Sequence, residues 1–176
     1  MDRQLTDSQF IARLQEEKEE LLKLNDDVLN ITPLNRLNTE YKITVNAPCY
    51  LYTENYGEPV LSNGPHELKM TVSREYPFNK ARIYFTDVNK RLAHVDVFPT
   101  GTVSIGDVWD PHCHNLVYLV KKMMLLLSFD PCFINFYSMS DKNYRDWMKK
   151  MVLNRKFPTF KWSEPVTATR KIIKLN

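Results

Sequence analysis

This sequence has few cysteines, no long hydrophobic run and only a small excess of positive charge. The three cysteines, Cys49, Cys113 and Cys132, show no CxxC spacing, so neither a disulfide framework nor a zinc knuckle is predicted. No apolar run approaches the ~20 residues of a membrane-spanning helix, and the N-terminus MDRQLTDSQF lacks the apolar core of a signal peptide. We therefore expect reduced thiols, a cytoplasmic protein and no membrane partner.

The charge balance argues against one class of partner. The 24 basic and 21 acidic residues are spread along the chain and leave a net charge of +3, a bias too small to indicate nucleic acid. What the sequence does have is apolar residues, which make up 43% of its 176 residues, enough to bury one core. We expect one domain over residues 1–155 and a C-terminal tail over residues 156–176.

An amphipathic helix is predicted near the N-terminus. Thr6 and Gln9 match a capping box, and apolar residues then recur at helical spacing over residues 7–25. The acidic side of this helix, residues 16–20, is predicted to face solvent. A loop is expected around Pro33.

Alternating apolar and polar residues predict an antiparallel meander of about four strands. The strands are expected over residues 41–45, from Leu51 onward, over residues 68–72, and around residues 83–85. Residues 57–64 read as a turn-rich connection. The N-terminal helix is expected to cover the buried face of this sheet.

Two further helices follow a long irregular stretch. A wide apolar stripe predicts a central helix over residues 115–128, ending before Asp130-Pro131. A last helix is predicted over residues 140–153. The irregular stretch, residues 87–114, is long enough to be functional. This order of elements predicts an α+β domain.

The irregular stretch contains HVDVFPTGTVSIGDVWDP, with Ser104 near its centre. A hydrolase nucleophile elbow needs glycine two residues on each side of its serine, and only Gly106 meets that requirement because Thr102 occupies the other position. The run His-Cys-His at residues 112–114 lacks the usual zinc spacings, since neighbouring residues rarely aim their ligands at one tetrahedral centre. Neither a triad nor a metal site is predicted, and no cofactor is expected.

Five motifs in matching order resemble motifs of the ubiquitin-conjugating (E2) family. They are Tyr76-Pro77-Phe78, His94-Val95-Asp96, Gly101-Thr102-Val103-Ser104, Trp109-Asp110-Pro111 and the helix end MMLLLSFDP. The family counterparts are Tyr-Pro, His-Pro-Asn, Gly-x-Ile-Cys, Trp-Ser-Pro and a helix ending in Asp-Pro. The resemblance covers residues 7–152. It implies a UBC-like α+β fold with an N-terminal helix, a four-strand meander, a long active-site loop and two C-terminal helices.

The chain departs from the eukaryotic form of these motifs. Val95 stands in place of proline, Asp96 stands in place of asparagine, and the segment from Ser104 to Trp109 is shorter. The trimmed layout is more similar to bacterial E2-like proteins of antiviral-defence conjugation operons. The resemblance implies an enzyme that accepts the C-terminus of ubiquitin or a ubiquitin-like protein from an E1-like enzyme at position 104 and transfers it to an amine. An E3 or other operon proteins are further candidate partners.

Serine at position 104 conflicts with that activity. A cysteine thiol ionises near pH ~8.5, whereas a serine hydroxyl needs an adjacent base. An oxyester at Ser104 would also be a poorer acyl donor than a thioester. We expect that the functional protein has cysteine here and that this chain carries a Cys→Ser change. The alternatives are a natural non-catalytic E2 variant, an RWD-like binding domain, or Cys113 or Cys132 as the nucleophile.

The resemblance assigns further roles residue by residue. His94 would hold the turn through a backbone hydrogen bond, and Asp96 occupies the place of the asparagine that supports the oxyanion. Asp107 and Asp110 are candidates to orient or deprotonate the attacking amine, or else are turn caps. The partner-binding candidates lie on two loops and are Phe78, Trp109 and Pro111.

Overall fold

The computed structural model describes residues 4–106, 108–138 and 140–163. Predictions for Asp107 and for residues 164–176 therefore lie outside the described residues. The main elements, in chain order, are α1 (Asp7–Leu22), β1 (Leu29–Pro33), β2 (Glu40–Val45), β3 (Cys49–Leu51), β4 (Val60–Ser62), β5 (His66–Thr71), β6 (Arg82–Phe85), α2 (Leu116–Leu127) and α3 (Arg145–Leu153). The short 3-10 turns are η1 (Glu54–Tyr56), η2 (Val88–Lys90), η3 (Pro131–Phe133) and η4 (Lys142–Tyr144).

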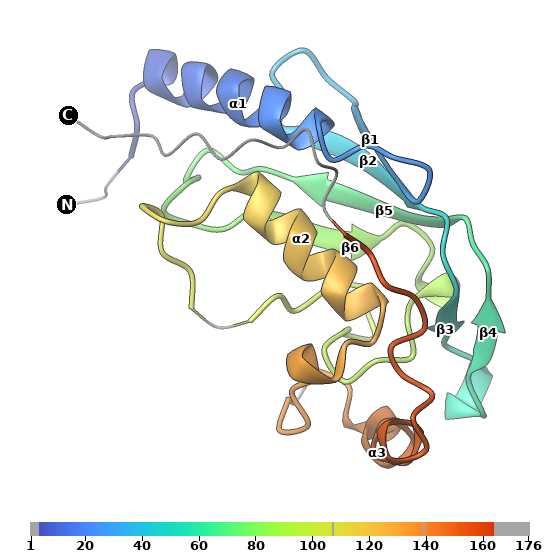
Figure 1. Ribbon diagram of the computed structural model, residues 1–176. Helices are drawn as coiled ribbons and strands as arrows, with labels where there is room; N and C mark the ends of the chain where they lie inside the picture. Colours follow the sequence, from blue (N-terminus) through green and yellow to red (C-terminus); the bar gives the residue numbers. More distant parts are fainter. Residues whose placement is uncertain (1–3, 107, 139, 164–176) are drawn as a thin grey trace.

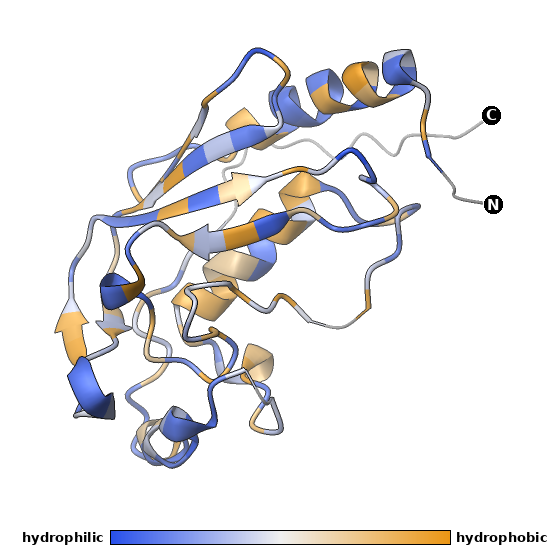
Figure 2. Cartoon of the chain, turned by 180° about the vertical axis from the view of Figure 1, so that it is seen from behind, coloured by the Kyte–Doolittle hydropathy of each residue, from blue (hydrophilic) through white to orange (hydrophobic). Residues whose placement is uncertain are grey.

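Four strands form one antiparallel sheet in the order β1-β2-β5-β6, and β3 pairs with β4 as a separate two-stranded sheet. Within the larger sheet Ile43 pairs with Leu68, and Met70 pairs with Ile83. Figure 2 shows hydrophobic and hydrophilic residues alternating along these strands. This alternation sends one set of side chains into the core and leaves the other set on the outer face.

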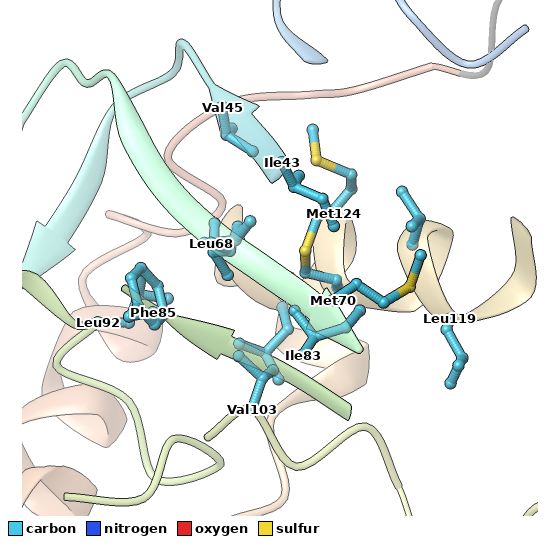
Figure 3. Packing of buried hydrophobic residues seen from close by; sticks show 14 of the residues in the cluster. Ile43, Val45, Leu68, Met70, Ile83, Phe85, Leu92, Val103, Leu119 and Met124 are labelled. Carbon is cyan, nitrogen blue, oxygen red and sulfur yellow. The ribbon is translucent and has the colours of Figure 1, made fainter. Parts of the chain in front are cut away.

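Helix α2, and not α1, covers the apolar face of the sheet (Figure 1). Figure 3 shows Met124 and Leu119 beside side chains of the strands, including Met70. Helix α1 instead contacts α2 and β1 at the side of the molecule. The prediction that α1 covers the sheet was wrong because α2 has the wider apolar surface, with seven buried residues against four in α1.

Three strand predictions needed correction. Pro33 ends β1 rather than lying in a loop, since Leu29 and Ile31 alternate inward ahead of it. Leu51 ends β3 instead of starting a strand, and β4 lies inside the region 57–64 that was read as turns. Strands of three residues carry too few alternating positions to be recognised locally.

The three predicted helices are present. Thr6 and Gln9 form the capping box of α1, and Asn115 caps α2 by accepting a hydrogen bond from the Tyr118 N–H. Helix α1 ends at Leu22, three residues before the predicted end. The last helix begins as the 3-10 turn η4 and continues as α3.

Glu17 is buried, although it was predicted to lie on a solvated face of α1. Its Oε2 accepts hydrogen bonds from the Tyr76 hydroxyl at 2.5 Å and from the Leu116 N–H at 2.9 Å. Arg13 donates to Oε1 at 2.6 Å. The carboxylate can be buried because these three partners satisfy its hydrogen bonds. Leu116 is the first residue of α2, so the positive end of the helix dipole also stabilises the negative charge.

Residues 156–163 pack back on the rest of the chain. The ring of Phe157 stacks on Phe129 with centroids 4.5 Å apart. Further along, the indole N–H of Trp162 donates to Asp26 at 3.1 Å. We call residues 156–163 the strap. The domain boundary at residue 155 remains a prediction, and the strap follows directly after it in the chain.

Candidate functional site

A tight turn carries residue 104 at the edge of the sheet. Residues 97 and 103 form a β-bridge, and the Val103 N–H donates to the Ile83 carbonyl at 2.9 Å. Gly101 has φ +84°, and a Cβ there would lie 3.2 Å from the Phe85 carbonyl oxygen. Only glycine fits this turn without strain. The turn therefore places Ser104 immediately after a segment bonded to β6.

Ser104 is half-buried and lines a cleft of about 620 Å³. The cleft runs between residues 96–106 and Val108, helix α2, and residues 133–138 and Ser140. Its lining residues are Asp96, Phe98, Ser104, Ile105, Gly106, Val108, Tyr118, Lys122, Leu126, Phe133, Asn135, Tyr137, Ser138 and Ser140. Position 104 is thus accessible from a surface cleft and is not enclosed in the core.

Asp96 joins two walls of the cleft. Its backbone carbonyl accepts a hydrogen bond from the Ser104 N–H at 2.7 Å. Its carboxylate Oδ2 accepts one from the Asn135 N–H at 3.1 Å. One buried residue thereby sets the position of both Ser104 and Asn135.

His94 is fully buried behind the turn. Its Nδ1 accepts a hydrogen bond from the Asp96 N–H at 3.0 Å, so the ring proton is on Nε2. Burial lowers the pKa of His94 from 6.5 to about 3, and the ring is neutral at physiological pH. The 3.6 Å approach of Nδ1 to the Asp96 carboxylate is consequently not an ion pair. His94 braces the turn and does not line the cleft.

Asp110 lies in its own turn and is not among the lining residues. Its carboxylate accepts a hydrogen bond from the His112 N–H at 2.8 Å, and this bond is the main cause that lowers the pKa of Asp110. The Asp110 N–H donates to His114 Nδ1 at 3.0 Å. These contacts are those of a turn cap.

The predicted partner-binding residues lie on two loops that are joined to each other. The indole N–H of Trp109 donates to the Pro77 carbonyl at 2.5 Å. This N–H is therefore engaged within the protein. Phe78 and Pro111 are both half-buried. The Pro111 carbonyl accepts a long hydrogen bond from Arg13 at 3.5 Å. The two loops are therefore neighbours, and Phe78 is only partly accessible to a partner.

Of the residues that line the cleft, the sequence predicted only Asp96 and Ser104. Lys122 and Asn135 are among the lining residues that it missed. Lys122 lies on α2 between Tyr118 and Leu126 at four-residue spacing, a stripe that helical periodicity could have identified. Its ammonium lies 4.0 Å from the Phe133 ring centroid. Asn135 lies in an irregular segment, where no periodicity indicates which side chains face the cleft.

The cysteines lie outside the set that lines the cleft. Cys49 is buried, which raises the pKa of its thiol well above the ordinary range. Cys113 is exposed, and a hydrogen bond with Asp110 raises its pKa too. Cys132 is exposed beside Phe133, a lining residue. Within residues 4–106, 108–138 and 140–163, no three His, Cys, Asp or Glu side chains gather as a metal site, and no helix is long and apolar enough to cross a membrane.

Comparison with solved structures identifies the fold. The sequence matches no family model and no curated protein. Human ubiquitin-conjugating enzyme E2 G1 aligns with 16% identity and a TM-score of 0.52, over 70% of this chain and 98% of that one. A structure described as a novel ubiquitin-conjugating enzyme aligns with 14% identity and a TM-score of 0.52, over 82% of this chain and 86% of that one. The chain therefore has the α+β fold of ubiquitin-conjugating enzymes.

Proposed function

We propose that this protein is an E2-like carrier of ubiquitin or a ubiquitin-like protein. Position 104 receives the modifier C-terminus from an E1-like enzyme as an ester and passes it to an amine. The observation that carries this proposal is the placement of Ser104, which follows a glycine turn on β6 and opens into a cleft in a ubiquitin-conjugating fold. The short segment between Ser104 and Trp109 supports a bacterial defence-operon origin, and the composition supports a cytoplasmic location.

Serine at position 104 makes this carrier slow or inert. No side chain among the described residues is hydrogen-bonded to the Ser104 hydroxyl, so no base is in place to remove its proton. Asp96 is next to it in the cleft, but its Oδ2 is engaged with the Asn135 N–H. This arrangement also favours a second candidate function, a non-catalytic E2 variant that binds the modifier or a partner E2.

Ser104→Cys tests the carrier function. The variant is incubated with ubiquitin-activating E1, ATP and ubiquitin, and separately with ubiquitin carrying a small-thiol thioester at its C-terminus, which needs no E1. We expect an adduct with one ubiquitin that a thiol reductant cleaves. The chain with Ser104 should form at most a slow adduct that resists reductant and is cleaved by mild alkali, as an oxyester is.

Ser104→Ala is the matched control and should form no adduct. If the Ser104→Cys variant stays unloaded with both donors, the carrier function is wrong. Binding of ubiquitin without an adduct, measured by titration, would then support the non-catalytic variant. An adduct that persists in Ser104→Ala would move the nucleophile to another residue such as Cys132.

A further inference from the structure

Transfer of an acyl group from position 104 needs a hydrogen-bond donor in the cleft. Attack of an amine on an ester carbonyl places negative charge on the carbonyl oxygen, and donors aimed at that oxygen commonly make the largest contribution to catalysis. The residue bonded to the Ser104 backbone is Asp96, whose carboxylate accepts hydrogen bonds and repels an oxyanion. The donor must therefore come from another wall of the cleft.

Asn135 is linked to Ser104 by two hydrogen bonds that both end on Asp96. The Ser104 N–H donates to the Asp96 carbonyl at 2.7 Å, and the Asn135 N–H donates to the Asp96 carboxylate at 3.1 Å. Both Ser104 and Asn135 line the cleft. Asp96 alone thus connects position 104 to the backbone of Asn135, because it accepts a hydrogen bond from each.

The side chain of Asn135 is oriented by a second hydrogen bond. Its Oδ1 accepts from the Tyr137 N–H at 3.0 Å, which requires the carbonyl oxygen at that end of the amide. The Nδ2 group is consequently the other end, and it makes no hydrogen bond within the described residues. A donor that is oriented and still available is what a developing oxyanion requires.

The other polar side chains of the cleft make contacts of their own, and within the described residues no hydrogen bond links them to Ser104. The Ser138 hydroxyl donates a hydrogen bond to the Ser140 hydroxyl at 3.2 Å. The Lys122 ammonium lies over the Phe133 ring. Tyr137 is 91% exposed at the rim. Among these donor side chains, that of Asn135 belongs to the residue that is linked to Ser104 through Asp96.

We propose that the Asn135 amide is a catalytic group that binds the oxyanion during acyl transfer from position 104, with Asp96 as its positioning residue; this inference rests on the proposed carrier function. The amine nitrogen of the acceptor bonds to the carbonyl carbon while the carbonyl π electrons move onto oxygen. Collapse of this adduct reforms the carbonyl and breaks the bond to the residue 104 heteroatom. The amine proton ends on that leaving group, giving an amide and a free hydroxyl or thiol.

Single-turnover discharge in the Ser104→Cys background tests this role. The protein is loaded with ubiquitin, E1 and ATP are removed, and free lysine is added as the acceptor. Asn135→Asp keeps the acceptor for the Tyr137 N–H and the backbone bond to Asp96 but removes the Nδ2 donor. We expect its discharge to lysine to slow by about 100-fold. Loading should stay within about twofold, because the thiolate at position 104 that attacks the E1 thioester is a stronger nucleophile than the amine of lysine and depends less on the oxyanion donor.

Asn35→Asp is the matched control, since Asn35 also accepts a backbone N–H, from Thr39, and lies outside the cleft. It should discharge at the parental rate. If Asn135→Asp loads and discharges like the parent, Asn135 only forms a turn and the inference is wrong while the carrier function stands. If no reductant-sensitive adduct forms in the parent, both are wrong.

Discussion

At the scale of single residues, His94 shows how burial sets the chemistry of a side chain. Its ring is enclosed, contacts Phe129 at 5.2 Å between centroids, and accepts the Asp96 N–H. The Nε2 group has no hydrogen-bond partner within the described residues. Charging this ring in place would cost its desolvation energy with no compensating partner. His94 is therefore a structural residue at the base of the turn, and it makes stability depend on pH.

We expect the free energy of unfolding to fall as the pH drops below 6.5. The pKa of His94 is about 3 in the folded chain and 6.5 in the unfolded one, so the unfolded state takes up the proton first. Between pH 7.5 and 5.5 this contribution removes about 1.4 kcal/mol. Urea unfolding of the parent and of His94→Asn at both pH values measures it.

The comparison with His94→Asn isolates this histidine from other titrating groups. Burial also lowers the pKa of His66, but that effect is common to both proteins and cancels. The stability gap between parent and variant should narrow by about 1.4 kcal/mol at the lower pH. A gap that is equal at both pH values would show that His94 is not held neutral.

At the scale of elements, Glu17 joins three parts of the fold that surround the site. Its carboxylate links α1 to the Tyr76 loop and to the first residue of α2, Leu116. The same Tyr76 loop is bonded to Trp109 through the Pro77 carbonyl. One carboxylate on α1 thereby helps to set the position of the loop that follows Ser104.

Glu17→Ala should lower the free energy of unfolding by about 3 kcal/mol, because it leaves the Tyr76 hydroxyl and the Leu116 N–H without their acceptor and removes the ion pair with Arg13. Chemical denaturation monitored by tryptophan fluorescence measures the loss. Glu16→Ala is the control on the same helix, since Glu16 is exposed, and it should change stability by no more than about 0.5 kcal/mol. Equal effects of the two substitutions would contradict the buried network.

At the scale of the whole molecule, the strap of residues 156–163 closes an aromatic cluster at one end of the core. Phe157 stacks on Phe129 and meets Tyr50 and Trp147 edge-on. Phe129 in turn contacts His94. The strap thus reaches the base of the site through two layers of rings, although it is remote from position 104 in the sequence.

Phe157→Ala should lower the free energy of unfolding by about 3 kcal/mol, since it empties a buried aromatic site. Thermal unfolding reports the loss, and removal of residues 156–176 should reproduce it. Leu153→Ala, which alters a side chain that is 82% exposed, should be neutral. If removal of these residues leaves the unfolding midpoint unchanged, residues 1–155 are a complete domain as the sequence predicted.

Most of the architecture was predictable because its signals are local. The capping box at Thr6, the alternation of β2 and β5 and the apolar stripe of α2 each lie within one stretch of chain. The short strands β3 and β4 were not resolved correctly because three residues hold too little periodicity. Glu17 was misassigned because its burial depends on partners 59 and 99 residues away.

The sequence alone determined the fold class, through the order of elements whose periodic patterns are each local, and the glycine turn with Ser104 after it, through residues that are neighbours in the chain. Only the tertiary structure decided which side chains meet Ser104 in the cleft. Asp96 and Asn135 are 39 residues apart, and their hydrogen bond exists only because α2 lies across the sheet and returns the chain to the turn. The tertiary structure also places Asp110 outside the cleft, because its carboxylate is hydrogen-bonded within its own loop.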